Sequence, residues 1–258
     1  MTRIIKWVTY KKIEDKGLKM TPVFKRILLK LSGEGLAGEE KTGISPEAVQ
    51  KLVREIVRVH DLGVQIGLVV GGGNFFRGAK NAIGNMDRSV ADQIGMMATL
   101  MNALTLQSSL EECGTKVKIF SGLAMPQVCD TYSFRKAIKA LQDGEIVLFA
   151  AGTGSPYFST DSGAALRAAE MHCDVLMKAT QVDGVYDSDP RTNPNAQRYD
   201  EVSYDEVVAK QLKVMDLTAV SMARDNHIPI MVFEQKGEDS IVKAVCGQVK
   251  HTMIKQRG

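Results

Sequence analysis

Short apolar runs alternate with helical patterns along almost the whole chain. The run from Lys25 to Leu31 ends at a polar glycine turn and predicts a buried strand. After it, Ser45 can cap a helix, Pro46 suits the first helical position and Gly63 can end the helix. Because this alternation repeats toward the C-terminus, the sequence predicts an α/β fold with helices layered on a largely parallel central sheet.

Further elements are predicted at regular intervals. The predicted strands are 64–70, 116–120, 145–150, 174–180 and 228–233, and the predicted helices are 88–113, 133–142, 161–172, 204–211 and 218–226. Met96, Met97 and Met101 in the longest helix are interpreted as core residues rather than as a metal or cofactor site. Asp183-Gly184 is typical of a two-residue hairpin turn, and residues 252–255 are expected to form an edge strand.

Composition excludes several classes of protein. The chain has 258 residues and a net charge of +3, which is too small to indicate a nucleic-acid-binding surface. Its four cysteines lack metal-ligand spacing, and a few free thiols are typical of the cytoplasm. No apolar run is long enough for a membrane span, and the N-terminus lacks the features of a signal peptide.

We expect an extension outside the fold at residues 1–20 and one domain, of one or two lobes, at residues 21–258.

Three loops that follow predicted strands are rich in glycine or hydroxyl residues. They read KLSGE from Lys30, GGGNFFRG from Gly71 and AGTGSPYFSTD from Ala151. In an open α/β sheet, ligands bind beyond the carboxyl ends of the strands, where unhindered N–H groups and helix N-termini favour anions. The three loops together therefore predict a phosphate-rich ligand.

The common nucleotide-binding and hydrolase motifs are absent from the sequence. There is no GxxxxGK[ST] motif of a P-loop, no HRD or DFG motif of a protein kinase, and no GxSxG elbow of a serine hydrolase. Counting from Gly71, the Rossmann fingerprint requires a glycine where Phe76 stands. The predicted phosphate site is therefore of another kind.

Four charged residues in or near these loops have more than one interpretation. Lys30, near the end of the first strand, either contacts a phosphate or faces solvent. Arg77 either holds a phosphate with its planar fork or is an ordinary surface arginine. Asp92 either has a functional role or stabilises the dipole of the long helix. Asp161 is placed to cap its helix, which is compatible with a functional role.

Taken together, these residues resemble the bacterial uridylate (UMP) kinases of the amino-acid kinase superfamily. The resemblance runs from about Lys25 to near the C-terminus and includes KRILLKLSGE, GGGNFFRG, AGTGSPYFSTD, LMKATQVDGVYDSDP, LKVMDLTA and ARDNHIPIMVF. It implies a three-layer αβα sandwich and phosphoryl transfer from ATP to UMP with Mg²⁺, a step of pyrimidine nucleotide biosynthesis. It also implies a cytoplasmic homohexamer that GTP activates and UTP inhibits.

The resemblance assigns site residues by position. Lys30, Asp161 and Lys178 would be catalytic, and no residue would be a dedicated metal ligand. ATP would be bound by Lys30, Leu31, Ser32, Gly33, Gly73, Arg77, Thr180, Tyr186 and Asp189. UMP would be bound by Gly72, Arg77, Asp92, Thr153, Gly154, Ser155, Pro156, Tyr157, Phe158, Ser159 and Thr160. GTP would act at Gly38, Glu39, Glu40, Lys41, Thr42 and Gly43.

Such a reaction needs no general base, because the acceptor is an anionic phosphate oxygen of UMP. Two polyanions must meet, so catalysis would depend on charge neutralisation and positioning. One alternative is another superfamily member that phosphorylates a carboxylate or carbamate, which would need no ribose-binding acid at Asp92. The other is a nucleotide sensor without turnover, against which the joint presence of Lys30, Arg77 and Asp161 argues.

Overall fold

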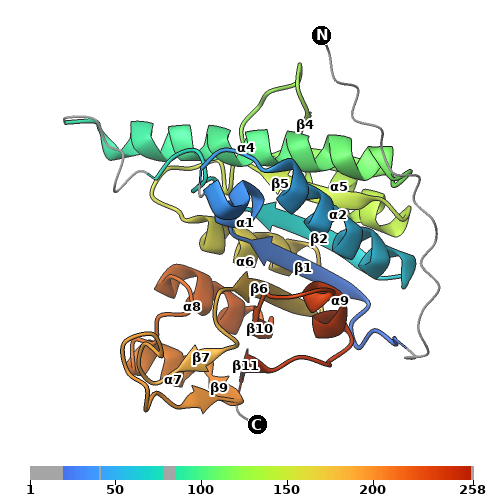
Figure 1. Ribbon diagram of the computed structural model, residues 1–258. Helices are drawn as coiled ribbons and strands as arrows, with labels where there is room; N and C mark the ends of the chain where they lie inside the picture. Colours follow the sequence, from blue (N-terminus) through green and yellow to red (C-terminus); the bar gives the residue numbers. More distant parts are fainter. Residues whose placement is uncertain (1–19, 41, 78–84, 257–258) are drawn as a thin grey trace.

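A nine-stranded sheet forms the centre of the computed structural model, which describes residues 20–40, 42–77 and 85–256 (Figure 1). Its strands are β1 (Arg26–Leu31), β2 (Gln65–Val70), β3 (Val117–Ser121), β4 (Asp130–Thr131), β5 (Ile146–Ala150), β6 (Val175–Thr180), β9 (Glu201–Ser203), β10 (Ile230–Glu234) and β11 (His251–Lys255). Their order is β4-β3-β5-β2-β1-β6-β10-β11-β9. Of these neighbours in the described chain, only β10 and β11 pair antiparallel, which confirms the largely parallel sheet.

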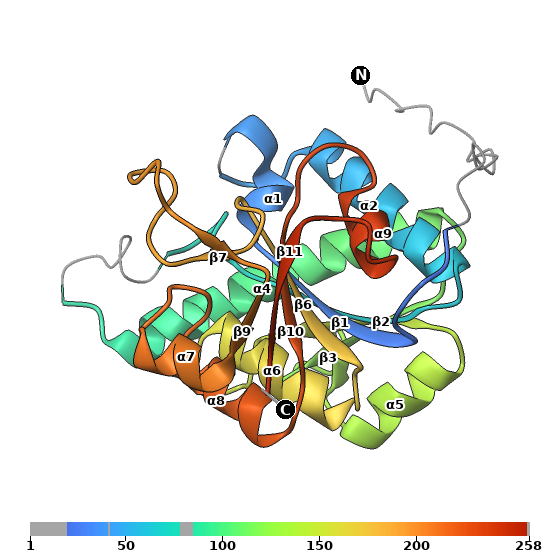
Figure 2. The same ribbon diagram turned by 90° about the horizontal axis from the view of Figure 1, so that it is seen from below.

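Helices cover both faces of the sheet (Figure 2). They are α1 (Glu34–Ala37), α2 (Pro46–Asp61), α4 (Arg88–Glu112), α5 (Phe134–Gln142), α6 (Thr160–Glu170), α7 (Tyr204–Ala209), α8 (Leu217–Asp225) and α9 (Ser240–Val245), with a 3₁₀ turn η1 (Gly38–Glu40). One core joins the sheet to α2, α4 and α9, and a second joins it to α5, α6, α7 and α8. The three-layer αβα prediction is confirmed.

Strand β1 shows why both faces must be covered. Ile27 and Leu29 belong to the core under α2 and α4, whereas Leu28 belongs to the core on the opposite face. All three are almost fully buried, and each such burial contributes about 1.5–3 kcal/mol. Because successive side chains of a strand point to opposite faces, a strand that is apolar at consecutive positions is stable only between two layers.

The predicted boundary signals of α2 operate as expected. The Oγ atom of Ser45 accepts a hydrogen bond from the N–H of Ala48 at 3.3 Å, and Pro46 is the first helical residue. Gly63, just after the helix, has a φ of +84°, which favours glycine because it has no Cβ. Gly114 follows the end of α4 with a φ of +81°.

Two predictions about the C-terminal half are wrong. Asp183 and Gly184 do not join two hairpin strands: β7 (Val185–Tyr186) pairs antiparallel with β8 (Arg198–Tyr199) across a much longer loop. Residues 252–255 belong to β11, which lies inside the sheet because the short β9 pairs with its outer side. The sequence pattern missed β9 since a three-residue strand has too few positions to show alternation.

The three methionines of α4 divide between the core and the exposed surface of the helix. Met96 is buried as predicted, but Met97 and Met101 are 36% and 43% exposed, so their assignment to the core is wrong. A helix this long turns part of its surface away from the sheet, and these two residues lie there.

Residues 1–19 of the predicted extension lie outside the described residues, and its last residue, Met20, packs against the core.

Candidate active site

The three glycine- and hydroxyl-rich loops meet at one edge of the sheet. Strands β5, β2, β1 and β6 are parallel neighbours, so their carboxyl ends lie side by side. The N–H of Gly71, after β2, donates a hydrogen bond to the carbonyl of Leu31, at the end of β1, at 3.1 Å. The loops therefore converge where an open α/β sheet binds its ligands.

Two glycines permit this close approach. A Cβ atom on Gly33 would lie 2.3 Å from the carbonyl oxygen of Gly71, and one on Gly72 would lie 2.7 Å from the Cβ atom of Ala98. Both distances are too short for any side chain. Gly33 thus lets the first loop pack on the second, and Gly72 lets the second loop pack on α4.

A pair of buried asparagines locks the triple-glycine loop onto α4. The side-chain amides of Asn74 and Asn102 exchange two hydrogen bonds of 2.9 and 2.8 Å. The Nδ2 atom of Asn102 also donates to the carbonyl of Gly71, and that of Asn74 to the carbonyl of Gly43, both at 2.8 Å. Sequence reasoning missed this pair, and the only signal was a polar residue in the middle of an apolar helical stretch.

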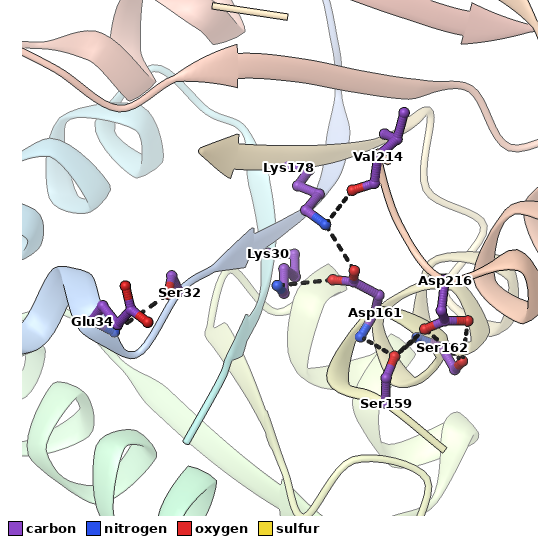
Figure 3. A network of polar contacts seen from close by, with 9 residues as sticks. All are labelled: Lys30, Ser32, Glu34, Ser159, Asp161, Ser162, Lys178, Val214 and Asp216. Atoms are coloured by element: carbon purple, nitrogen blue, oxygen red, sulfur yellow. Dashed lines mark hydrogen bonds and ion pairs between the residues drawn. The ribbon is translucent and has the colours of Figure 1, made fainter. Parts of the chain in front are cut away.

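Three charged side chains form a cluster at the ends of β1, β6 and α6 (Figure 3). The Nζ atoms of Lys30 and Lys178 lie 2.8 and 2.7 Å from the two carboxylate oxygens of Asp161. The Nζ atom of Lys178 also donates to the carbonyl of Val214 at 2.5 Å. Lys30 and Lys178 stand opposite each other in the β1–β6 register, which brings their side chains to the same face. The structure thus brings the three predicted catalytic residues together.

The cluster carries a net charge of +1 when all three groups are ionised. Burial alone would raise the pKa of Asp161, but the ammonium groups of Lys30 and Lys178 outweigh it and hold that pKa below its ordinary value. Burial lowers the pKa of Lys178, although the Asp161 carboxylate opposes this. The side chain of Lys30 is only 14% exposed, so its interpretation as a solvent-facing lysine is wrong. A buried net positive charge suits a phosphate oxygen.

Asp161 does not cap α6, so that interpretation is wrong. The cap is Ser159, whose Oγ atom accepts hydrogen bonds from the N–H groups of Asp161 and Ser162 at 3.0 and 3.1 Å. Asp216 accepts hydrogen bonds from the hydroxyls of Ser159 and Ser162, and this role of Asp216 was missed by sequence reasoning. Since Ser159 satisfies the helix terminus, the carboxylate of Asp161 can turn toward the two lysines.

A cavity of about 590 Å³ opens beside the cluster. Lys30, Ser32, Lys178 and Thr180 line it, and it extends toward Arg191. The other residues assigned to ATP are not part of its described lining: Leu31, Gly33, Gly73, Arg77, Tyr186 and Asp189. The cavity therefore joins the lysine–aspartate cluster to the segment after β6, but it accounts for only part of the predicted ATP site.

Residues Tyr186 and Asp189 have local partners. The hydroxyl of Tyr186 donates to the carboxylate of Asp183 at 2.6 Å, and Asp189 forms an ion pair of 2.9 Å with Arg191. The hydrogen bond to Asp183 raises the pKa of Tyr186. These contacts lie within the partly exposed segment after β6 and do not reach the cluster.

Arg77 lies between two of the loops. It forms an ion pair with Glu34 of α1, and its Nε atom donates to the carbonyl of Gly73 at 3.2 Å. Glu34 lines the cavity, so the guanidinium lies close to the place where phosphates would enter. Gly78, the last residue of the quoted glycine motif, lies outside the described residues.

The loop after β5 is anchored to the start of α4 and has an unusual backbone. The Oδ2 atom of Asp92 accepts a hydrogen bond from the N–H of Tyr157 at 2.8 Å. Asp92 therefore contacts the predicted UMP loop directly, in addition to any effect on the helix dipole. The φ angles of Ala151, Gly152, Gly154 and Tyr157 are +55°, +56°, +81° and +71°. Positive φ at two non-glycine residues is strained, so the surroundings must hold this loop in place.

The segment assigned to GTP is connected to the same site. The N–H of Gly43 donates to the carbonyl of Asn74 at 2.9 Å, which complements the side-chain contact between these residues. Lys41, a predicted member of this segment, lies outside the described residues.

In the part of the chain that the structure describes, no group of three His, Cys, Asp or Glu side chains could hold a metal ion, and no helix is long and apolar enough to cross a membrane.

Comparison with known proteins defines the class of this one. The amino acid kinase family is matched over residues 25–234, so the chain belongs to the amino acid kinase family. Uridylate kinase of Erythrobacter litoralis is 52% identical over 233 residues, which cover 90% of this chain and 98% of the relative. Uridylate kinase of Paramagnetospirillum magneticum is 48% identical over 231 residues, which cover 90% of this chain and 96% of that relative. Within the family, the chain therefore belongs to the uridylate kinases.

Solved structures agree with this placement. The crystal structure of UMP kinase from Bacillus anthracis is similar with a TM-score of 0.87 at 34% identity, covering 91% of this chain and 97% of that one. The crystal structure of UMP kinase from Ureaplasma parvum matches with a TM-score of 0.86 at 35% identity, and the match covers 90% of this chain and 99% of that one. The amino-acid-kinase-like fold predicted from the sequence is confirmed.

Proposed function

We propose that this protein is a UMP kinase, which transfers the γ-phosphoryl group of ATP to UMP and releases UDP and ADP. The observation that carries the proposal is the cluster of Lys30, Asp161 and Lys178, held at the end of a parallel sheet beside three phosphate-type loops. The relatives named uridylate kinase support UMP as the acceptor.

The lysines would neutralise the transferring phosphoryl group. Lys30 and Lys178 come from adjacent strands, so their ammonium groups have fixed positions before the reaction begins. Asp161 would orient them and would not act as a base, since its pKa is held low and both of its oxygens face lysines. Arg77 would exchange Glu34 for the nucleotide phosphates.

The two nucleotides would approach the cluster from different loops. The phosphates of ATP would lie along residues 30–33 and Gly73, with adenine and ribose near Thr180, Tyr186 and Asp189. UMP would lie against Gly72 and residues 153–160, with its ribose at Asp92. The converging loops, and the cavity beside the carboxyl ends of β1 and β6, support this arrangement.

Mg²⁺ would accompany ATP. The carboxylate oxygens of Asp161 each face a lysine, so the cluster suits phosphate oxygens better than a bare cation, and the ion would rest mainly on the donor phosphates and water. When bound, Mg²⁺ neutralises charge on those phosphates.

The proposal includes a cytoplasmic homohexamer that GTP activates through residues 38–43 and UTP inhibits. Four apolar residues of α4 support a subunit contact, because they are 36–45% exposed and recur at the spacing of one helix face: Val90, Ile94, Met97 and Met101. Native mass spectrometry would measure the subunit number, and a monomer would contradict this part of the proposal.

A coupled assay of ADP release separates the candidate functions. The assay would offer UMP, CMP, acetylglutamate and aspartate as acceptors, and we expect turnover that depends on UMP. Turnover with acetylglutamate or aspartate would favour a kinase of carboxylates, and nucleotide binding without turnover would favour a sensor. Asp92→Asn should chiefly raise the KM for UMP, and an unchanged KM would remove Asp92 from the ribose site.

A further inference from the structure

A buried arginine lies directly behind the predicted UMP loop. Arg167 of α6 is 4% exposed, and its Nη1 atom lies 2.7 Å from the carboxylate of Glu170. Its guanidinium carbon lies 3.5 Å from the ring centroid of Tyr132, whose hydroxyl donates to the same carboxylate. Because a buried charge is costly, an arginine is retained at such a position only where its contacts compensate.

The second nitrogen of the fork reaches the loop itself. The Nη2 atom of Arg167 donates to the carbonyl of Gly152 at 3.3 Å. In a trans peptide, a carbonyl and the N–H of the next residue point in opposite directions. The contact to Gly152 therefore turns the N–H of Thr153 away from Arg167. Within the described residues, that N–H donates no hydrogen bond.

We propose that Arg167 is a positioning residue that holds the Gly152–Thr153 peptide, so that the N–H of Thr153 is presented to the acceptor nucleotide. This inference rests on the proposed function, since the loop that it places is the predicted UMP loop. The ligand group would be an oxygen acceptor of a pyrimidine nucleotide, either on the base or on the phosphate. Arg167 would touch no substrate and would act through the backbone alone.

The geometry requires an arginine rather than any cation. The planar fork spans the Glu170 carboxylate with one nitrogen and the Gly152 carbonyl with another, while its face stacks on Tyr132. A lysine could keep the charge beside Glu170, but one ammonium group cannot make all three contacts. The positive φ angle of Ala151, a non-glycine residue next to this peptide, explains why the turn needs support.

The test separates a positioning role from a merely structural one. Arg167→Met should raise the KM for UMP about tenfold, as expected for the loss of a hydrogen bond from a charged group, and leave the KM for ATP within about twofold. Arg167→Lys should also raise the KM for UMP, but by a smaller factor. This second variant keeps the test decisive if Arg167→Met does not fold. Without any nucleotide, amide hydrogen exchange of residues 153–158 should become faster in both variants.

Leu110→Ala is the matched control. Leu110 is fully buried near the far end of α4, so its truncation lowers stability without touching the loop. If this control changes the KM for UMP and the loop exchange as much as the Arg167 variants do, the positioning role is overturned. An absence of UMP turnover in the wild type would refute the proposed function instead, and the exchange measurement would still decide whether Arg167 holds the loop.

Discussion

The phosphate end and the base end of the predicted nucleotide site are built in different ways. At the phosphate end, Lys30, Asp161 and Lys178 come from three elements of the core and are about 15% exposed. At the base end, Tyr186 and Asp189 bond to residues only three and two positions away. In the proposed site, the groups that would meet a developing charge thus stand on strands and a helix, whereas the groups that would only add binding stand on a partly exposed segment.

The physical reason for this difference is preorganisation. A charge held in a buried, fixed position stabilises a transition state without reorganisation, and its effect is larger in a low dielectric. Contacts in the exposed segment are screened by water and are worth less. Substitutions at the phosphate end should therefore change kcat, and those at the base end should change the KM for ATP by small factors.

Asp161→Asn should have the largest effect among substitutions that break this contrast. It leaves two buried lysines without their shared counter-ion, so kcat should fall about 10²–10³-fold and stability by about 3–5 kcal/mol. Coupled kinetics and urea unfolding measure the two quantities. Asp189→Asn, at the base end, is the matched control and should change neither appreciably. Equal effects of the two substitutions would remove the contrast.

Asn102→Ala should have the next largest effect. It removes the donor to the Oδ1 atom of Asn74 and to the carbonyl of Gly71, at a cost of about 1–3 kcal/mol. Because the triple-glycine loop would loosen, the KM values of both nucleotides should rise. Asn226→Ala is the control, since Asn226, the C-cap of α8, is exposed and its side chain donates to the carbonyl of Met222 in the preceding turn. Equal stability of the two variants would show that the asparagine pair does not lock the loop.

The sequence predicted the fold and singled out Lys30, Asp161 and Lys178, but it did not predict how these three residues are held together. Apolar strands and capped helices depend on local periodicity, so β1 and α2 were found within a residue or two. The contact between Asn74 and Asn102 depends on how α4 packs against the loop after β2, and no local pattern encodes that packing. Asp161 was placed at a helix start as its cap, but only the structure shows that Ser159 is the cap instead. The exposure of Met97 and Met101 depends on the rotation of α4 on the sheet.

The alkaline limb of kcat/KM provides a smaller test of the phosphate end. Burial lowers the pKa of Lys178, so activity should fall at a pH below its ordinary value of 10.5, as the net charge of the cluster drops from +1 to 0. The folded state loses this proton before the unfolded state does, so this titration by itself makes stability rise with pH. Unfolding measured at the same pH is the control. A fall in kcat/KM that begins only at or above pH 10.5, or that coincides with unfolding, would contradict the role of Lys178 in the cluster.

Tyr186→Phe should have the smallest effect. It removes one hydrogen bond to half-buried Asp183, so the KM for ATP should rise by no more than about threefold with kcat unchanged. Steady-state kinetics at saturating UMP measure both constants. A tenfold loss of kcat would mean that the base end takes part in the transition state.

The most direct test is single-turnover phosphoryl transfer by Lys30→Ala. With both nucleotides saturating, the wild type should convert γ-labelled ATP and UMP into labelled UDP. The variant should do so about 10²–10³-fold more slowly while its affinity for UMP changes little, because the contact of Lys30 strengthens in the transition state. Transfer at the wild-type rate, or a defect confined to nucleotide binding, would contradict the role of the lysine–aspartate cluster.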